Sequence, residues 1–152
     1  MFQLQFWIFL AVSVSLALLS VRIKKITFID LQIIIMIIAV TMSLDMLFCK
    51  QFNLYNYVNT DYKGWYSFWA NFIIAPSLGI IFVKFIPESP GKIALYIIIW
   101  SVLLTALELF ILKPATIVIY HGWRPFPYSL IGYILCFILE DIYFESLKKQ
   151  LK

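Results

Sequence analysis

Five long apolar runs divide the chain, and charged or turn-forming residues separate them. The runs cover about residues 4–21, 27–49, 65–85, 93–112 and 126–144. A helix that crosses the hydrocarbon core of a bilayer needs about 20 mainly apolar residues, so each run is close to a spanning length. The pattern therefore predicts an all-α fold: a polytopic membrane bundle of five transmembrane helices in a single domain over residues 1–152.

The segments between the runs differ in character. The break at residues 86–92 (IPESPGK) contains two prolines and a glycine, which interrupt helices. Residues 50–64 form a polar, aromatic loop. Ala115–Tyr120 is apolar and β-branched but too short to span. It either continues the fourth helix beyond a kink at Pro114 or lies as an extended segment over the outer mouth of the bundle, and we favour the second arrangement.

Composition excludes most soluble classes. Hydrophobic residues make up 63% of the chain and charged residues 13%, whereas a soluble domain is about 45–50% apolar and about 25% charged. The 152 residues leave no room for a separate soluble domain beside five spans. Cys49 and Cys136 fall in different apolar runs, and we interpret both as small apolar residues without a disulfide.

The distribution of basic residues predicts an orientation. Five spans place the termini on opposite sides of the membrane, and positive residues accumulate on the cytoplasmic side. The first run is followed, not preceded, by positive charge and has no cleavage site, so we expect a retained first helix with the N-terminus outside and the C-terminus cytoplasmic. Eight of the twelve Lys and Arg residues then lie inside: Arg22, Lys24, Lys25, Lys84, Lys92, Lys148, Lys149 and Lys152.

Each of the last four helices carries one stripe of small or polar residues. Residues three or four apart share a helix face, and small or polar residues favour close helix contacts in lipid. We therefore expect these stripes to face inward. They are Thr41, Asp45 and Cys49; Ser67, Asn71, Ala75 and Gly79; Ser101, Thr105 and Glu108; and Gly132, Cys136 and Glu140.

A candidate polar pocket lies in the outer half of the bundle. At about 1.5 Å per residue, Asp45, Asn71 and Glu108 each fall roughly 6–9 Å below the outer helix ends. Lys113 and His121 follow on the same side and would set the charge of the acids, while Trp123 would anchor the loop at the interface. The predicted pocket therefore contains Asp45, Asn71, Glu108, Lys113, His121 and Trp123.

Three interpretations of the acids stay open. They could be interhelical hydrogen-bonding groups, a site for a substrate, proton or ion, or single carboxylates that reach the interface. His121 could carry protons or simply form a loop hydrogen bond. Pro76 removes a hydrogen bond to the carbonyl of Phe72, so the third helix should bend near Asn71.

No pattern in the chain indicates soluble-type chemistry. It lacks a serine-hydrolase order of residues, an HExxH zinc motif, nucleotide-binding glycines and a Cys-x-x-Cys pair. We expect no catalytic set, no cofactor, no metal site and no nucleic-acid partner. The expected partners are the lipid bilayer and either a second copy of the chain or another membrane protein.

The run Trp69–Tyr143 resembles a family of small, uncharacterised multi-span membrane proteins of spore-forming Gram-positive bacteria. Pro76, Trp100, Leu107–Leu109 and Tyr120–Trp123 (YHGW) carry the resemblance. It implies a four- or five-helix protein of the bacterial plasma membrane and no particular activity.

Two functions follow as hypotheses. The first is a small integral membrane protein that binds a partner, small ligand or cation through the outer polar pocket. The alternative is a proton- or ion-conducting transporter or channel subunit that uses Asp45 and Glu108. The inner half offers few polar groups for a conducting path beyond Ser13, Ser20 and Glu140, which argues against a monomeric pore.

Overall fold

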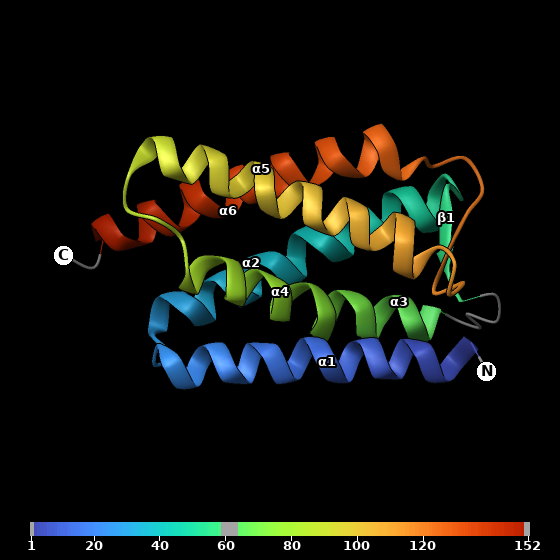
Figure 1. The fold of residues 1–152 in the computed structure, drawn as a ribbon, viewed down its shortest axis with the longest axis horizontal. Helices are drawn as coiled ribbons and strands as arrows, with labels where there is room; N and C mark the ends of the chain where they lie inside the picture. Colours follow the sequence, from blue (N-terminus) through green and yellow to red (C-terminus); the bar gives the residue numbers. More distant parts are fainter. Residues whose placement is uncertain (1, 59–63, 151–152) are drawn as a thin grey trace.

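The computed structural model describes residues 2–58 and 64–150, which are mostly helical (Figure 1). Three helices continue directly into π-helical turns, in which hydrogen bonds join residues five apart. The elements in order are α1 (Phe2–Ile23), α2 (Phe28–Asp45) with η1 (Met46–Gln51), β1 (Tyr55–Tyr57), α3 (Trp65–Trp69), η3 (Ala70–Ile74), α4 (Ala75–Lys84), α5 (Pro90–Leu107) with η4 (Glu108–Leu112), β2 (Val118–Tyr120), η5 (Pro125–Ser129) and α6 (Leu130–Gln150).

Within the described ranges, four helical stretches are long and apolar enough to cross a membrane: Leu4–Ile23, Phe28–Gln51, Trp65–Lys84 and Pro90–Leu112. They correspond to the first four predicted helices. The last helix, α6, is of similar length but carries five charged residues in its second half.

The predicted end of the last helix near Phe144 was wrong, because α6 continues to Gln150. Two contacts of Lys148 stabilise the additional turns. Its ammonium group lies 2.8 Å from the Glu145 carboxylate one turn earlier and 4.2 Å from the centre of the Phe144 ring. Lysines in a last helical turn also interact favourably with the carbonyl groups at the helix end.

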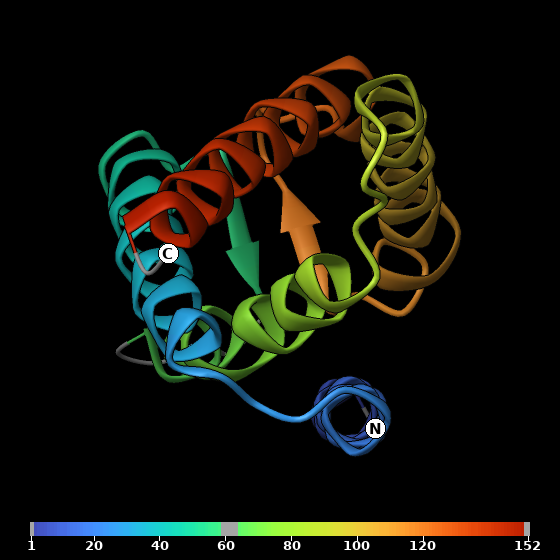
Figure 2. The same ribbon diagram turned by 90° about the vertical axis from the view of Figure 1, so that its left-hand side faces the viewer.

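Four helical columns enclose the interior (Figure 2). Viewed along the bundle, α2, α6, α5 and the α3–α4 column form a ring, while α1 lies outside it against α4. The side chain of Phe6 on α1 is fully buried, and its ring meets the Tyr66 ring edge-on at 5.0 Å. Aromatic packing of this kind holds the peripheral helix onto the ring of four.

A short antiparallel strand pair closes one end of the ring and modifies the predicted all-α fold. β1 pairs with β2 so that Asn56 lies opposite Ile119. The expectation that Ala115–Tyr120 is extended is confirmed for the β2 portion, Val118–Tyr120. Its partner strand, inside the predicted polar loop 50–64, was not anticipated. We call the strand pair and its flanks, residues 54–57 and 118–123, the strand cap.

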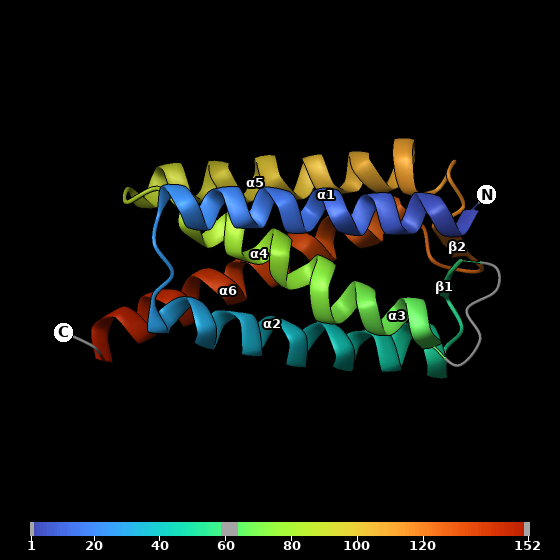
Figure 3. The same ribbon diagram turned by 90° about the horizontal axis from the view of Figure 1, so that it is seen from below.

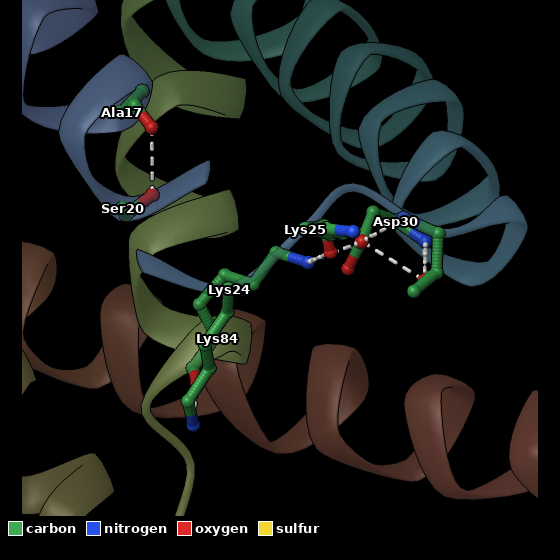
Figure 4. A network of polar contacts seen from close by, with 7 residues as sticks. Ala17, Ser20, Lys24, Lys25, Asp30 and Lys84 are labelled. Atoms are coloured by element: carbon green, nitrogen blue, oxygen red, sulfur yellow. Dashed lines mark hydrogen bonds and ion pairs between the residues drawn. The ribbon is translucent and has the colours of Figure 1, made fainter. Parts of the chain in front are cut away.

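A buried ion pair ties helices together at the opposite end (Figure 4). Nζ of Lys84 lies 2.5 Å from Oδ2 of Asp30 and 2.7 Å from the carbonyl oxygen of Lys25. Asp30 also forms a capping box with Thr27 at the start of α2. Lys24 donates to the carbonyl of Lys84 at 2.5 Å. The sequence placed these lysines at the inner surface, but Lys84 is a buried structural cation.

Pro76 changes the path of the third helix by a π turn just before it. The amide of Ala75 bonds to the carbonyl of Ala70, five residues earlier. If the same five-residue spacing continued, the backbone nitrogen of Pro76 would face the carbonyl of Asn71, but proline has no N–H to donate. The Thr41 hydroxyl donates to this carbonyl instead, at 3.4 Å. The predicted irregularity near Asn71 is therefore present as a π turn. Figure 3 shows the resulting α3–α4 column running obliquely between α1 and α2.

Candidate functional site

A partly open cavity of about 300 Å³ lies between the ring of helices and the strand cap. Its wall is mostly aliphatic and aromatic, and every helix of the ring contributes to it. Among the described residues that line it there is no Lys, Arg or His. Besides Cys136 and four tyrosines, its polar members are Thr41, Asn71, Glu108, Ser129 and Glu140.

Glu108 reaches the cavity from the junction between α5 and η4. The hydroxyl of Tyr133 on α6 donates a hydrogen bond to its Oε1. Its Oε2 is buried and accepts no hydrogen bond of good geometry from a described residue, although the hydroxyls of Ser129 and Tyr120 lie close to the carboxylate. Burial, and after it the nearby Glu108 carboxylate, raises the pKa of the Tyr120 hydroxyl. Tyr120 therefore remains a neutral group at physiological pH, and it does not neutralise the acid.

Asp45 is buried behind the cavity wall and joins three elements. Its carboxylate accepts hydrogen bonds from Ser67 on α3 and from the Tyr55 hydroxyl on β1, the latter at 3.1 Å. Burial, followed by the Asp45 charge, raises the pKa of Tyr55, so this hydroxyl stays protonated and can donate. Tyr55 itself lines the cavity. Asp45 thus fixes the strand cap to α2 and α3 and does not itself line the cavity.

Asn71 lines the cavity from the π turn of the α3–α4 column. Its side-chain amide donates to the carbonyl of Ser67 at 3.0 Å, and it is a further neighbour of the Asp45 carboxylate. The side chain is 6% exposed. Asn71 therefore connects the Asp45 network to the cavity wall.

All three predicted intramembrane polar residues adjoin π-helical turns. Asp45 directly precedes η1, Asn71 lies within η3, and Glu108 begins η4. At η4 the backbone carbonyl of Glu108 accepts from the amide of Lys113 at 2.8 Å. Single π turns inside α-helices occur frequently at functional sites, because they rotate the following side chains out of the regular α-helical register. Their coincidence with these residues supports the choice of this region as the site.

Lys113 and His121 do not join the acids. Both side chains are exposed, and neither lines the cavity. The Nε2 atom of His121 lies 3.1 Å from the side-chain amide nitrogen of Asn56 on β1. The geometry therefore gives no support to the expectation that these two residues set the charge of Asp45 and Glu108. Their positions in the sequence correctly indicated the end of the bundle at which they lie, but their side chains do not reach its interior.

Trp123 lines the cavity and holds the strand cap in place. Its indole N–H donates to the Ser129 hydroxyl at 2.8 Å, and its ring packs against Tyr55 at 6.1 Å between centroids. The backbone amides of residues 121–123 all point to one acceptor, the carbonyl of Leu54, at 2.9–3.1 Å. A Cβ at Gly122 would lie 3.3 Å from the Leu54 side chain, so a small residue suits this position. The YHGW segment, residues 120–123, thus covers one end of the cavity.

Sequence reasoning did not include Glu140 in the pocket. It placed this acid among the few polar groups of the inner half, and the side chain is only 5% exposed and lines the cavity. Its Oε1 has no hydrogen-bond partner in the described chain, and Lys148 pairs with Glu145 instead. The stripe of Gly132, Cys136 and Glu140 could have indicated that Glu140 belongs to the pocket, because all three residues line the cavity.

The cavity therefore combines two glutamates, neutral hydroxyl donors and aromatic faces. A carboxylate in an apolar interior is stable only when it is protonated or when a cation lies beside it. No basic side chain of the described residues lines the wall, so none of them supplies that cation. This arrangement can hold a proton or a small positively charged ligand. Searches found no matching family model, no matching curated protein and no matching solved structure.

Proposed function

We propose that the chain is a five-span protein of the bacterial plasma membrane, with its N-terminus outside and its C-terminus in the cytoplasm. The four long apolar helices and the comparable length of α6 support five spans. The first helix, α1, begins at one end of the bundle, and the last helix, α6, ends at the opposite end (Figure 1). The buried Lys84 and the exposed Lys24 and Lys25 cluster at the end opposite the strand cap, as the positive-inside rule requires. The resemblance to the spore-former family supports the plasma membrane.

Labelling of single cysteines tests this orientation. In a Cys49→Ala, Cys136→Ala background, a membrane-impermeant thiol reagent applied to intact cells should label Arg124→Cys and leave Glu88→Cys unlabelled. Both positions are exposed and lie in links between helices. Both variants should react after the cells are opened. The reverse pattern would invert the orientation, and equal labelling in intact cells would contradict five spans.

We further propose that the protein binds a small cationic ligand in its interior cavity. One observation carries this proposal: Glu108 presents an unpartnered carboxylate oxygen within a cavity whose described lining contains no basic residue. The volume of about 300 Å³ falls at the lower end of the range for small-molecule sites, about 300–1,000 Å³. The wall is mainly apolar with a few convergent polar groups, which is the usual composition of such sites.

Thermal stabilisation by cations tests binding. Purified protein in detergent is heated with sodium, potassium or tetramethylammonium chloride at constant ionic strength. A ligand that binds only the folded state raises the free energy of unfolding by RT ln(1 + [L]/Kd). At least one cation should raise the midpoint of the wild type and of Glu145→Gln, an exposed control acid, but not that of Glu108→Gln. If no cation acts and Glu108→Gln and Asp45→Asn merely lower the midpoint, the acids are structural.

A second candidate function is proton or ion conduction. Glu140 favours it, because this inner polar residue is buried and lines the same cavity as Glu108. Tyr133, the partner of Glu108, precedes Glu140 by seven residues on α6, which separates the two acids by about 10 Å along the bundle. Liposomes containing wild-type protein should then show cation-dependent or proton flux that Glu108→Gln abolishes. Absence of flux in the wild-type liposomes, with binding retained, would leave binding as the function.

A further inference from the structure

We propose that the ligand of the cavity is an organic ammonium ion, bound with its charged group against Glu140 and its apolar body against the aromatic wall. This inference rests on the proposed cavity-binding function and specifies its ligand class. It assigns the principal charge contact to Glu140, an acid outside the set of six residues that the sequence predicted.

Glu140 is an incomplete polar site. Its side chain is 95% removed from solvent, and its Oε1 has no hydrogen-bond partner among the described residues. The titratable groups that its charge influences are Cys136 on the same helix and Tyr96 on α5, neither of which is a cation. An isolated buried carboxylate is strongly unfavourable, and a positive group from a ligand would remove that penalty.

The bundle makes room for this carboxylate at a specific position. Gly79 on α4 faces it, and a Cβ added to Gly79 would lie 2.8 Å from Oε1 of Glu140 and 2.2 Å from Cδ1 of Ile37 on α2. Three helices therefore approach one another where α4 has no side chain. The carboxylate occupies the space beside the glycine at the inner part of the cavity.

The wall beyond Glu140 suits an apolar cation. Tyr133, Phe137 and Glu140 follow one another at helical spacing on α6, and all three line the cavity. Tyr55, Tyr57, Tyr120 and Trp123 contribute further aromatic rings nearer the strand cap. An ammonium group is attracted to the negative faces of aromatic rings, and aromatic sites recognise quaternary ammonium ligands.

A bare metal ion fits the same wall poorly. No group of three or more His, Cys, Asp or Glu in the described part of the chain is arranged to hold a metal. Gly79, which faces Glu140 from α4, offers no side-chain oxygen. Hard cations require several oxygen ligands. An ammonium ion with methyl or aryl substituents needs only one carboxylate and apolar contacts.

The test uses benzyltrimethylammonium, a compact aryl ammonium ion, and neopentylbenzene, its neutral isostere. Binding to the full chain in nanodiscs of zwitterionic lipid is measured by calorimetry, with empty nanodiscs subtracted. We expect saturable binding of one cation per chain and at least tenfold weaker binding of the isostere. Glu140→Gln should raise the Kd at least tenfold, and Glu145→Gln, on the same helix but outside the cavity, should leave it unchanged.

Each other outcome overturns the inference. Equal affinity for the cation and the isostere on wild-type protein would show an apolar cavity without charge recognition, and this comparison does not depend on any variant folding. Wild-type affinity in a folded Glu140→Gln variant would remove Glu140 as the contact. If sodium or potassium stabilises the protein but the organic cation does not bind, the ligand class is wrong while the proposed cation binding stands. If none of them binds, both proposals fail.

Discussion

Replacing either of two glycines by alanine separates a close helix contact from ordinary helix propensity. Gly79 and Gly132 both lie in helices and both line the cavity. A Cβ at Gly79 would meet Ile37 Cδ1 at 2.2 Å and Glu140 Oε1 at 2.8 Å, whereas a Cβ at Gly132 would meet nothing within 4 Å. The propensity gain of alanine over glycine, about 1 kcal/mol, applies to both positions and cancels in the comparison.

The contact then sets the difference between the two variants. Overpacking a tight interior costs about 1–3 kcal/mol, and here the displaced atoms are side-chain ends that can partly move aside. We expect Gly132→Ala to be stabilised by about 1 kcal/mol, and Gly79→Ala to be about 1–3 kcal/mol less stable than Gly132→Ala. At about 2–4 °C per kcal/mol, the apparent midpoints should differ by about 2–12 °C.

The assay is thermal unfolding of both purified variants in one detergent, followed by circular dichroism. A second readout is the affinity for benzyltrimethylammonium, which should fall in Gly79→Ala because the new methyl group displaces the Glu140 carboxylate. Equal shifts of the two midpoints would refute the close approach of α2, α4 and α6 at Gly79. An unchanged affinity in Gly79→Ala, together with a lowered midpoint, would separate the contact from the ligand site.

Three further predictions concern the two ends of the bundle. Lys84→Met leaves Asp30 as a buried unpaired charge and should destabilise the protein by about 3–5 kcal/mol, whereas adding Asp30→Asn should recover most of the loss in thermal unfolding. The raised pKa of Tyr55 keeps its hydroxyl protonated in the folded state, while the unfolded side chain ionises near pH 10. The contribution of Tyr55 to stability should therefore be full below pH 10 and fall by up to about 1.4 kcal/mol per pH unit above it, so alkaline thermal unfolding should show a shallower slope in Tyr55→Phe. Trp123→Phe removes the hydrogen bond to Ser129 and should cost about 0.5–1.5 kcal/mol; an unchanged midpoint would show that the indole N–H contributes nothing to the cap.

Helix positions and inward faces could be predicted because both follow from local pattern. Apolar runs of spanning length and the stripes of small and polar residues depend only on helix periodicity. The stripe of the α3–α4 column is a good example: Ser67 is buried against Asp45, and Asn71, Ala75 and Gly79 line the cavity. The identity of the inward face of each helix therefore needed no knowledge of its neighbours.

The strand pairing and the partners of individual charged side chains could not be predicted in the same way, because both depend on contacts between residues distant in sequence. β1 and β2 are about 60 residues apart, and three residues on each strand carry too little pattern to indicate pairing. Glu140 was assigned to the inner half of the bundle and left out of the predicted pocket. Whether an acid near a helix end turns toward lysines or toward a cavity depends on the space available, here beside Gly79. Rules for charge pairs spaced along one helix do not describe the space that a neighbouring helix leaves open.

The placement of cations is the feature that makes the cavity chemically unusual. Every lysine that could neutralise a nearby acid in the described bundle is engaged elsewhere or lies outside the cavity: Lys84 pairs with Asp30, Lys148 with Glu145, and Lys113 is exposed. Asp45 accepts hydrogen bonds from two hydroxyl groups, and the charge of Lys50 also acts on it. Among the acids that the structure describes, only Glu108 and Glu140 line the cavity, and each has one buried oxygen without a hydrogen bond of good geometry. Glu108 joins α5 to α6 through the Tyr133 hydroxyl, whereas no hydrogen bond from a described residue reaches Oε1 of Glu140. Their unpaired oxygens are what a cationic ligand would complete.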